Sequence, residues 1–285
     1  MSARILDGRA AADEVLAELA AHALRLARRP GLGVVLVGED PASALYVRHK
    51  TRAAARLGYV QRQETLSQGA SQDDVLAVVR ALGADPDIDG ILVQLPLPAH
   101  VSRDAVLDAI DPAKDVDGLH PLDAGWLSQG RPGLVPCTPL GVMELLRRTG
   151  LPLRGAEAVV VGRSNLVGRP MARLLEGADC TATLCHRHTR TLEAHVRRAE
   201  ILVVAAGAAG CVPGEWVREG AVVIDVGINR LPDGTLCGDV GFHAARARAA
   251  WITPVPGGVG PMTIAMLMRN TLEASVRRQP VLGAP

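Results

Sequence analysis

The stretch that decides the fold of this chain is residues 159–170, which read VVVGRSNLVGRP. Three consecutive valines indicate a buried strand, and a glycine turn and the start of a helix follow them. This order is the context of a phosphate-binding turn, although Ser164 stands at the middle glycine of the usual pattern and Gly168 comes one residue late. Small residues and the N–H groups of a helix N-terminus still suit a pyrophosphate. By itself the stretch is equally compatible with a plain glycine-containing turn.

Short apolar runs alternate with helical spacing on both sides of this turn, as is typical of a parallel sheet covered by helices. In the second half, strands are predicted at residues 158–161, 181–185, 201–205, 222–225 and 251–253, and helices begin near residues 168, 191 and 242. In the first half, strands are predicted at residues 34–37, 59–65 and 90–95, and helices at residues 9–29, 41–57 and 71–82. The fold class is therefore α/β.

The two halves are separated by residues 111–136, which are rich in Gly and Pro and show turn chemistry with little periodicity. A last helix, at residues 262–275, follows a second Gly- and Pro-dense segment and can return to the first half. We expect two α/β domains flanking a cleft. Residues 1–136 and 262–285 form one domain, and residues 137–261 form a Rossmann-like dinucleotide-binding domain.

Composition excludes several classes of function. The 285 residues include 31 Lys and Arg against 30 Asp and Glu, so the chain has no strong field for nucleic acid. The longest weakly polar run, residues 201–212, is too short to cross a bilayer, and the first nine residues do not resemble a secretory signal. Five cysteines without a CxxC pair indicate reduced thiols rather than disulfides or zinc. We expect a cytoplasmic protein without membrane contact.

The strand at residues 181–185 ends in His186-Arg187-His188, where an NAD-selective site carries an acid for the ribose hydroxyls. A basic cluster suits a 2′-phosphate, as does Arg163 with its planar fork of donors. This favours NADP over NAD, against the alternative of a solvated basic loop. The same cluster lacks a fourth ligand and the usual spacing for a metal site.

A second set of polar residues lies in the first half. Asp40-Pro41 predicts a helix cap followed by proline at the first helical position, directly after a strand. Ser43, Tyr46 and Lys50 then follow one side of that helix and can converge on one pocket at the carboxyl edge of the sheet, where ligands gather. On the local pattern alone, an ordinary amphipathic helix with a solvated lysine is the favoured interpretation.

Three further residues have open interpretations. Gln94 interrupts an apolar strand, so its amide is either a buried structural link or a ligand group. Asp117 is compatible with a simple Asp-Gly turn. Cys137 precedes Thr138-Pro139, which reads as a helix cap, and no dedicated base accompanies the thiol. We therefore interpret Cys137 as structural.

Five segments occur in one order along the chain: residues 46–50 (YVRHK), 93–98 (VQLPLP), 114–118 (KDVDG), 162–164 (GRS) and 254–263 (PVPGGVGPMT). Together they resemble the bifunctional methylenetetrahydrofolate dehydrogenase/cyclohydrolase family. The similarity runs from about Ile5 to Leu272 and includes residues 136–139 and 224–229. Each segment is modest alone, but the ordered set is specific, and it favours functional roles for Lys50 and Asp117.

The resemblance implies two reactions: NADP-linked oxidation of 5,10-methylenetetrahydrofolate to the methenyl cation, then hydrolysis to 10-formyltetrahydrofolate. It implies that Lys50 is the central catalytic residue, assisted by Gln94 and Tyr46. The implied folate-binding residues are Tyr46, Asp117, Ser43, Pro256 and Gly257, and the implied cofactor-binding residues are Gly162, Arg163, Ser164, Gly168, Arg187 and Ile228. It also implies a homodimer. The alternatives are a monofunctional dehydrogenase and a catalytically silent NADP-binding regulator.

Physical chemistry makes these roles reasonable. A pterin presents adjacent N–H donors that the carboxylate of Asp117 can accept as a pair, and its ring can stack on Tyr46. A substrate that becomes cationic disfavours the ammonium form of Lys50, so a neutral amine is available as a base. The loop at residues 256–260 has little side-chain bulk, so its backbone can approach the nicotinamide side of the site.

Overall fold

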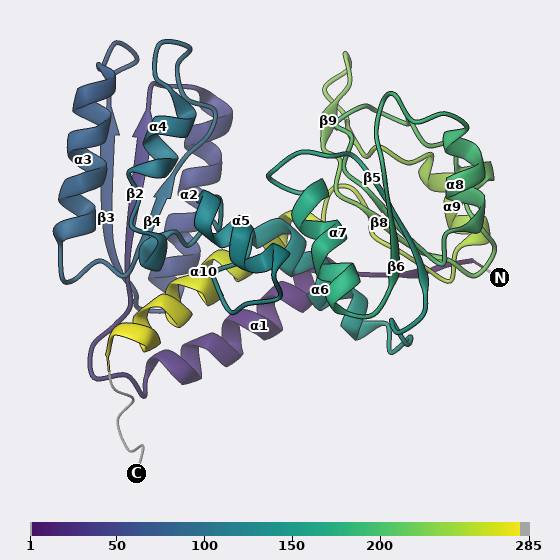
Figure 1. The fold of residues 1–285 in the computed structure, drawn as a ribbon, viewed down its shortest axis with the longest axis horizontal. Helices are drawn as coiled ribbons and strands as arrows, with labels where there is room; N and C mark the ends of the chain where they lie inside the picture. The colour runs from purple at the N-terminus through teal and green to yellow at the C-terminus, as the bar shows by residue number, and fades with distance from the viewer. Residues whose placement is uncertain (1, 280–285) are drawn as a thin grey trace. The chain divides into compact units, whose positions relative to one another are not determined.

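The computed structural model describes residues 2–279, so residues 1 and 280–285 of the expected first domain lie outside it. The described residues form two compact units. The six-stranded unit comprises residues 2–12 and 138–263, and the three-stranded unit comprises residues 13–137 and 264–279. Both units are α/β, which confirms the predicted fold class (Figure 1).

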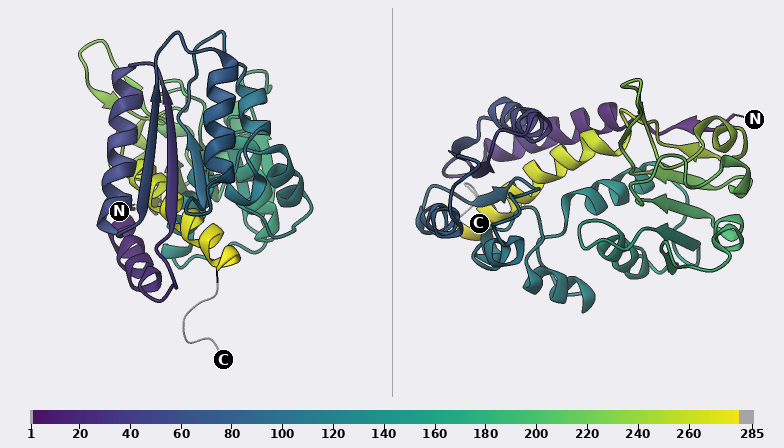
Figure 2. Two further views of the ribbon diagram at one scale, coloured as in Figure 1. Left: turned by 90° about the vertical axis from the view of Figure 1, so that its left-hand side faces the viewer. Right: turned by 90° about the horizontal axis from the view of Figure 1, so that it is seen from above.

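The three-stranded unit has a parallel sheet in which β2 (Gly31–Val37) lies between β3 (Val60–Leu66) and β4 (Gly90–Val93). Helix α2 (Pro41–Arg56) covers one face of the sheet, and α3 (Gln72–Ala84) and α4 (Arg103–Asp108) cover the other (Figure 2). Strands β2 and β4 are buried throughout and read as continuous apolar runs, whereas the edge strand β3 is polar and largely exposed. Because β3 and β4 lie on opposite sides of β2, the carboxyl ends of β2 and β4 form a topological switch point.

Four more helices are α1 (Gly8–Ala23), α5 (Pro121–Ser128), α6 (Cys137–Arg148) and α10 (Val259–Arg278). The interpretation of residues 111–136 as turns is wrong for α5. This helix has eight residues, with His120 as its N-cap and Pro121 at its start. It is too short to show a helical period, and Gly125 weakens its pattern further.

The six-stranded unit has an all-parallel sheet in the order β1-β11-β8-β7-β5-β6. Its strands are β1 (Arg4–Ile5), β5 (Glu157–Val161), β6 (Thr181–Cys185), β7 (Ile201–Val204), β8 (Val222–Asp225) and β11 (Trp251–Ile252). Helix α7 (Gly168–Gly177) lies on one face, and α8 (Leu192–Arg198) and α9 (Phe242–Arg248) lie on the other (Figure 1). Strands β6 and β7 flank β5 on opposite sides, which creates a switch point at the carboxyl ends of β5 and β7.

The first residues of the chain belong to the six-stranded unit rather than to the domain that we expected for residues 1–136. Arg4 and Ile5 of β1 pair in parallel with Trp251 and Ile252 of β11. A two-residue strand is too short for a periodic pattern, so only the backbone pairing reveals it. The unit is completed by η2 (Gly214–Trp216) and by a hairpin of β9 (Asn229–Arg230) and β10 (Leu236–Cys237), and η1 (Pro112–Lys114) lies in the other unit.

The carboxylate of Asp89 joins distant segments of the three-stranded unit. It is fully buried, accepts two hydrogen bonds from Arg28 (2.8 and 2.6 Å) and one from Arg278 (3.0 Å), and also accepts the backbone N–H of Gly31 (3.0 Å). Arg28 precedes β2, and Arg278 ends α10. Asp89 therefore ties the last helix to the start of the central strand.

Replacing Asp89 with Ala is expected to lower the free energy of unfolding by about 2 kcal/mol, because two partly buried guanidinium groups lose their acceptor. Urea unfolding followed by circular dichroism measures the change. Asp13→Ala is the matched control, since the pair of Asp13 with Arg56 is exposed on both sides and should contribute little. Equal losses in the two variants would contradict the role given to Asp89.

None of the helices in residues 2–279 is both long enough and apolar enough to cross a membrane.

Candidate functional site

The first part of the candidate site is built on α2, which starts beyond the carboxyl end of β2. Asp40 caps the helix, since its Oδ2 accepts the backbone N–H of Ser43 at 2.8 Å, and Pro41 stands at the first position. This confirms the predicted cap. Tyr46 and Lys50 lie one and two turns further along α2. Four residues apart, the two side chains lie on the same side of the helix.

Lys50 contacts Gln94 directly. The Nζ of Lys50 donates to Oε1 of Gln94 at 3.0 Å. The Nε2 of Gln94 donates to the carbonyl of Leu95 at 2.6 Å, and since a carbonyl can only accept, this bond leaves Oε1 to face the lysine. The side chain of Gln94 is thus held in one orientation, and Lys50 keeps two further donor positions.

The position of Gln94 differs slightly from the expected one. Strand β4 ends at Val93, so Gln94 is the first residue past the strand rather than a member of it. Its backbone N–H still donates to the carbonyl of Val35 at 2.9 Å, which continues the pairing with β2. Gln94 therefore lies at the switch point of the three-stranded unit, where the carboxyl ends of β2 and β4 meet.

Ser43 and Tyr46 differ sharply in exposure. Ser43 is buried, whereas Tyr46 is 47% exposed, a large value for an aromatic side chain. No hydrogen bond joins Ser43, Tyr46 and Lys50 to one another among residues 2–279. Tyr46 is therefore free to lie against a flat ligand ring, and Ser43 is a more remote member of the predicted set.

The loop that carries Asp117 is folded around another carboxylate, that of Asp115. Asp115 accepts the backbone N–H of His120 at 2.6 Å and also hydrogen-bonds the backbone amides of Gly118 and Leu119. The backbone of Asp115 also forms an isolated parallel β-bridge with Ile91 of β4, which places the loop beside that strand. Burial raises the pKa of Asp115 to about 6, and the charge of Asp117 adds to this effect.

Asp117 itself remains partly exposed, so its carboxylate can accept hydrogen bonds from a ligand. Its described partner is the thiol of Cys137, whose single proton is shared between this carboxylate and the carbonyl of Val116, 3.2 Å from Sγ. The charge of Lys50 acts on the same thiol, which indicates that Lys50, Asp117 and Cys137 lie close together. The structure therefore gathers Lys50, Gln94 and Asp117 at one edge of the three-stranded unit.

Cys137 is fully buried, and burial together with the charge of Asp117 raises the pKa of its thiol well above the usual value. Such a thiol is a poor nucleophile. Its contacts support a structural role, as the sequence predicts. Asn270 of α10 completes this packing by donating to the carbonyls of Val116 and Val135, both at 2.9 Å.

The second part of the site is the glycine turn after β5 in the six-stranded unit. Gly162 has φ +121°, and a Cβ there would overlap the carbonyl oxygen of Ala205. A Cβ at Gly168 would overlap the carbonyl oxygen of Gly162. Both positions therefore require glycine, because the loop after β7 packs on Gly162 and the start of α7 packs on the turn. This is the close approach that a phosphate-binding turn needs.

The residues between these glycines leave the turn open to solvent. Arg163 and Ser164 are exposed, and the hydroxyl of Ser164 accepts the backbone N–H of Val167 at 3.1 Å. Helix α7 begins at Gly168 without a side-chain cap and without an acid in its first turn. An uncapped helix N-terminus with an adjacent arginine favours an anion.

Arg187 lies at the same sheet edge. The backbone N–H of Gly162 donates to the carbonyl of Cys185 at 2.9 Å, so the glycine turn and the end of β6 are adjacent. Arg187 is exposed and hydrogen-bonds His188. No acid pairs with Arg163 or Arg187 among residues 2–279. The guanidinium groups of Arg163, after β5, and Arg187, after β6, are therefore available to bind an anion at this sheet edge.

Three further predicted site residues, Ile228, Pro256 and Gly257, also belong to this unit. Ile228 follows β8, is 48% exposed and lies near Gly260. The carbonyl of Gly257 accepts the backbone N–H of Gly8 at 3.0 Å, which ties the loop at residues 256–260 to the chain's first helix. Pro256 is exposed. An apolar side chain and a low-bulk loop thus stand near each other in the six-stranded unit.

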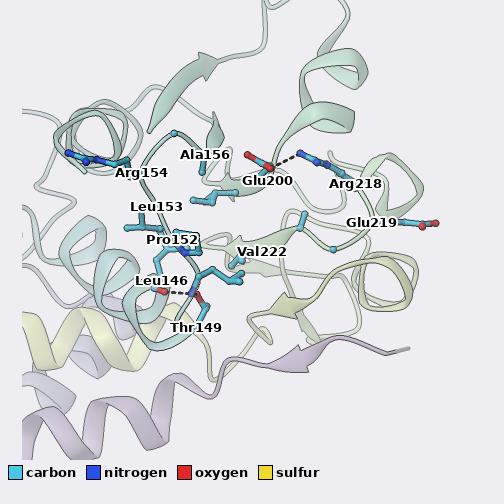
Figure 3. A pocket seen from close by; sticks show the side chains of 15 residues that line it. Leu146, Thr149, Pro152, Leu153, Arg154, Ala156, Glu200, Arg218, Glu219 and Val222 are labelled. Atoms are coloured by element: carbon cyan, nitrogen blue, oxygen red, sulfur yellow. Dashed lines mark hydrogen bonds and ion pairs between the residues drawn. The ribbon is translucent and has the colours of Figure 1, made fainter. Parts of the chain in front are cut away.

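A cavity of about 450 Å³ lies at the opposite edge of this sheet. It is lined by residues from the amino ends of β5, β7 and β8, including Ala156, Ile201 and Val222 (Figure 3). Its charged residues are paired, as Arg218 is with Glu200 at 3.1 Å. None of the predicted site residues lines it. Since ligands of parallel sheets bind at the carboxyl edge, we do not assign the reaction to this cavity.

Sequence reasoning missed several polar residues that shape the two parts of the site, namely Asn270, Thr253 and Asp239. Each is buried, and each acts on residues far away along the chain. A buried polar residue inside an apolar segment is the available signal, but it does not reveal the partner. All five cysteines are free, and residues 2–279 contain no cluster of acids, histidines and cysteines that could hold a metal ion.

Comparison with known families matches both units. The model for the tetrahydrofolate dehydrogenase/cyclohydrolase catalytic domain matches residues 6–117. The model for the tetrahydrofolate dehydrogenase/cyclohydrolase NAD(P)-binding domain matches residues 136–279. Both candidate site regions fall inside these matches.

Individual relatives agree over nearly the whole chain. Bifunctional protein FolD of Acidiphilium cryptum (strain JF-5) is 57% identical over 279 residues, 98% of this chain and 100% of that relative. The crystal structure of the FolD methylenetetrahydrofolate dehydrogenase/cyclohydrolase from Campylobacter jejuni has a TM-score of 0.94 and 42% identity, covering 97% of this chain and 100% of that chain. The crystal structure of the Trypanosoma brucei N5,N10-methylenetetrahydrofolate dehydrogenase-cyclohydrolase, complexed with NADP cofactor and inhibitor, has a TM-score of 0.93 and 41% identity. The match covers 97% of this chain and 98% of that chain.

Proposed function

This chain belongs to the tetrahydrofolate dehydrogenase/cyclohydrolase family, and on that premise we propose how its residues perform both reactions. The enzyme oxidises 5,10-methylenetetrahydrofolate to 5,10-methenyltetrahydrofolate and hydrolyses that product to 10-formyltetrahydrofolate. The observation that carries the residue assignment is the 3.0 Å hydrogen bond between Lys50 and Gln94 at the switch point of the three-stranded unit.

Lys50 acts in the hydrolysis. The methenyl carbon is electrophilic because its positive charge is shared with two nitrogens, so attack needs a water that loses its proton. A cation beside Lys50 disfavours the ammonium form, and the resulting neutral amine accepts that proton. Gln94 holds the amine through its oriented Oε1. The attack gives a carbinolamine. Its hydroxyl proton is then lost to solvent as the carbon–oxygen double bond forms, the carbon–N5 bond breaks, N5 takes up the proton held by Lys50, and the formyl group remains on N10.

Asp117 and Tyr46 position the folate. The partly exposed carboxylate of Asp117 accepts a pair of pterin N–H donors, a charge-assisted arrangement. Tyr46 offers an exposed ring on which the pterin can stack. Ser43, Pro256 and Gly257 complete the folate contacts that we propose. None of these groups changes charge in the reaction, so their contribution is orientation.

NADP fits the six-stranded unit. The glycine turn at Gly162 and Gly168, the hydroxyl of Ser164 and the uncapped start of α7 suit a pyrophosphate. Arg163 and Arg187 would hold the 2′-phosphate, and the exposed side chain of Ile228 would pack against an apolar part of the cofactor. When bound, the cofactor supplies the hydride acceptor for the oxidation.

Removing Arg163 is expected to raise the KM for NADP about tenfold and to leave the KM for NAD nearly unchanged, because a guanidinium–phosphate hydrogen bond is lost only with NADP. Steady-state dehydrogenase rates of Arg163→Ala with each cofactor measure this. Arg173→Ala is the control, since Arg173 lies further along α7 and pairs with Glu176. Equal increases for both cofactors would contradict a 2′-phosphate contact.

A single time course tests the proposed function. Purified protein is mixed with methylenetetrahydrofolate and NADP, and reduced nucleotide, methenyl intermediate and formyl product are followed together. The account predicts that reduced nucleotide and formyl product accumulate in equal amounts. Methenyl product without enzymatic formyl formation would identify a monofunctional dehydrogenase, and the absence of any reduced nucleotide would identify a silent NADP-binding protein.

We further propose a homodimer acting in the cytoplasm. The dimer follows from the family resemblance and is checked by light scattering on the purified protein. The compartment is supported by the five free cysteines, three of them buried, which fit a reducing environment.

A further inference from the structure

The carboxylate of Asp239 is fully buried in the six-stranded unit and accepts four N–H donors. Its Oδ2 accepts the backbone amides of Ala206 (2.7 Å) and Gly207 (2.8 Å). Its Oδ1 accepts the backbone amide of Ala208 (2.9 Å) and Nδ2 of Asn229 (2.8 Å). No ion pair to Asp239 occurs within residues 2–279. The charge of this carboxylate is therefore balanced by backbone and amide dipoles alone.

The three backbone amides belong to the loop that follows β7 at the switch point. Ala205 starts this loop, and its backbone N–H donates to the carbonyl of Val161, the last residue of β5, at 2.7 Å. The carbonyl oxygen of Ala205 is also the atom that a Cβ at Gly162 would overlap. The loop at residues 205–208 thus packs against the glycine turn, and its position sets one wall of the crevice beyond β5 and β7.

The backbone at Asp239 is in turn hydrogen-bonded to a residue of the sheet. Asp225, the last residue of β8, accepts the backbone amides of Asp239 (3.0 Å) and Val240 (2.9 Å). The backbone N–H of Asp225 donates to the hydroxyl of Thr253 at 2.8 Å. A side chain at Gly227 would overlap the Asp239 carboxylate, so that position must stay a glycine. The chain of contacts runs from the sheet through two buried carboxylates to the loop.

We propose that Asp239 is a positioning residue for the NADP site, fixing the loop at residues 206–208 so that the glycine turn at Gly162 keeps the shape that accepts the cofactor. This rests on the proposed function. Burying a carboxylate is costly, and a loop could be closed at lower cost by apolar packing. Four short hydrogen bonds hold the loop in a single arrangement, which preorganises the crevice.

Asp239→Asn tests the proposal. The replacement puts an NH2 group opposite two N–H donors, whichever oxygen it replaces, so part of the loop is released while the side-chain volume is kept. We expect the dissociation constant for NADP, measured by titration calorimetry, and the KM for NADP to rise about tenfold. The KM for folate and the hydrolysis of added methenyltetrahydrofolate should stay within about twofold of wild type. Lys50 and Asp117 belong to the other unit, and the hydrogen bonds to the Asp239 carboxylate come from residues 206–208 and Asn229 rather than from Pro256 or Gly257.

Asp233→Asn is the matched control, since Asp233 is an exposed acid in the turn of the β9–β10 hairpin, which directly precedes Asp239 in the chain. Unchanged NADP binding by Asp239→Asn would overturn the proposal. If that variant loses both activities together, Asn229→Ala decides, because it removes one donor and leaves Asp239 in place. A selective rise in the NADP constants for Asn229→Ala supports the proposal, and an equal loss of both activities overturns it. Failure of the proposed function is seen separately, as wild-type protein that binds NADP but turns over no folate.

Discussion

Replacing Lys50 with Met is expected to lower the cyclohydrolase rate by about three orders of magnitude, which is within the range for loss of a general base. Methionine keeps the length and apolar stem of lysine but cannot accept a proton or donate to Gln94. The dehydrogenase rate should fall far less, because hydride transfer depends on placing the methylene carbon rather than on a base. The two rates are measured separately, with methenyltetrahydrofolate and with methylenetetrahydrofolate as substrates.

Arg48→Met is the matched control, since Arg48 is an exposed cation of the same helix, two residues before Lys50. Its removal changes the net charge of α2 equally and should leave both rates near wild type. Full cyclohydrolase activity in Lys50→Met would refute the assignment of the base. Equal loss of both activities would instead assign Lys50 to substrate positioning alone.

Replacing Asp117 with Ala is expected to lower kcat/KM for folate by two to three orders of magnitude in both reactions, because a desolvated pair of charge-assisted hydrogen bonds is lost. Both reactions use the same folate-binding residues, so both should fall together, in contrast to Lys50→Met. The KM for NADP should stay unchanged. Rates at varied folate and fixed NADP measure the effect.

A substitution at Cys137 tests whether the loss expected for Asp117→Ala comes from the missing contact with the pterin. It hydrogen-bonds Asp117 but is too buried to reach solvent. Cys137→Ser preserves a donor to that carboxylate and should keep most of the folate affinity. If Asp117→Ala left folate affinity intact, the pterin contact would be wrong.

Much of the fold could be predicted from periodicity, because strands buried on both faces read as unbroken apolar runs. The predicted strand at residues 222–225 coincides with β8, which is buried throughout; the prediction at residues 181–185 also coincides with β6, although only Cys185 of that strand is buried. Glycine and proline account for two of the boundary errors. Strand β2 begins at Gly31 rather than at residue 34; a Cβ at Gly31 would overlap the carbonyl oxygen of Asp87, so a residue of low strand propensity stands at the start of the strand. Helix α10 begins at Val259, because a proline in the first turn is tolerated.

The site was predictable to the extent that its chemistry lies in local motifs. The cap at Asp40 and the turn at Gly162 follow from residue type and spacing alone. Lys50 and Gln94, by contrast, are joined only through the pairing of β2 with β4, and local pattern left both open. Asp239 could not be found at all, because its donors come from two loops that the sequence separates. Buried polar networks depend on tertiary contacts, which no window of sequence contains.

The central claim is that the amine of Lys50 works on the one-carbon unit of the folate. A crystal structure of the enzyme with NADP and a folate analogue tests it most directly, through the distance from Nζ of Lys50 to the bridge between N5 and N10. The account predicts hydrogen-bond reach of that bridge, about 3 Å directly or through one water. An Nζ directed into solvent, with the bridge beyond the reach of a single water, would contradict it.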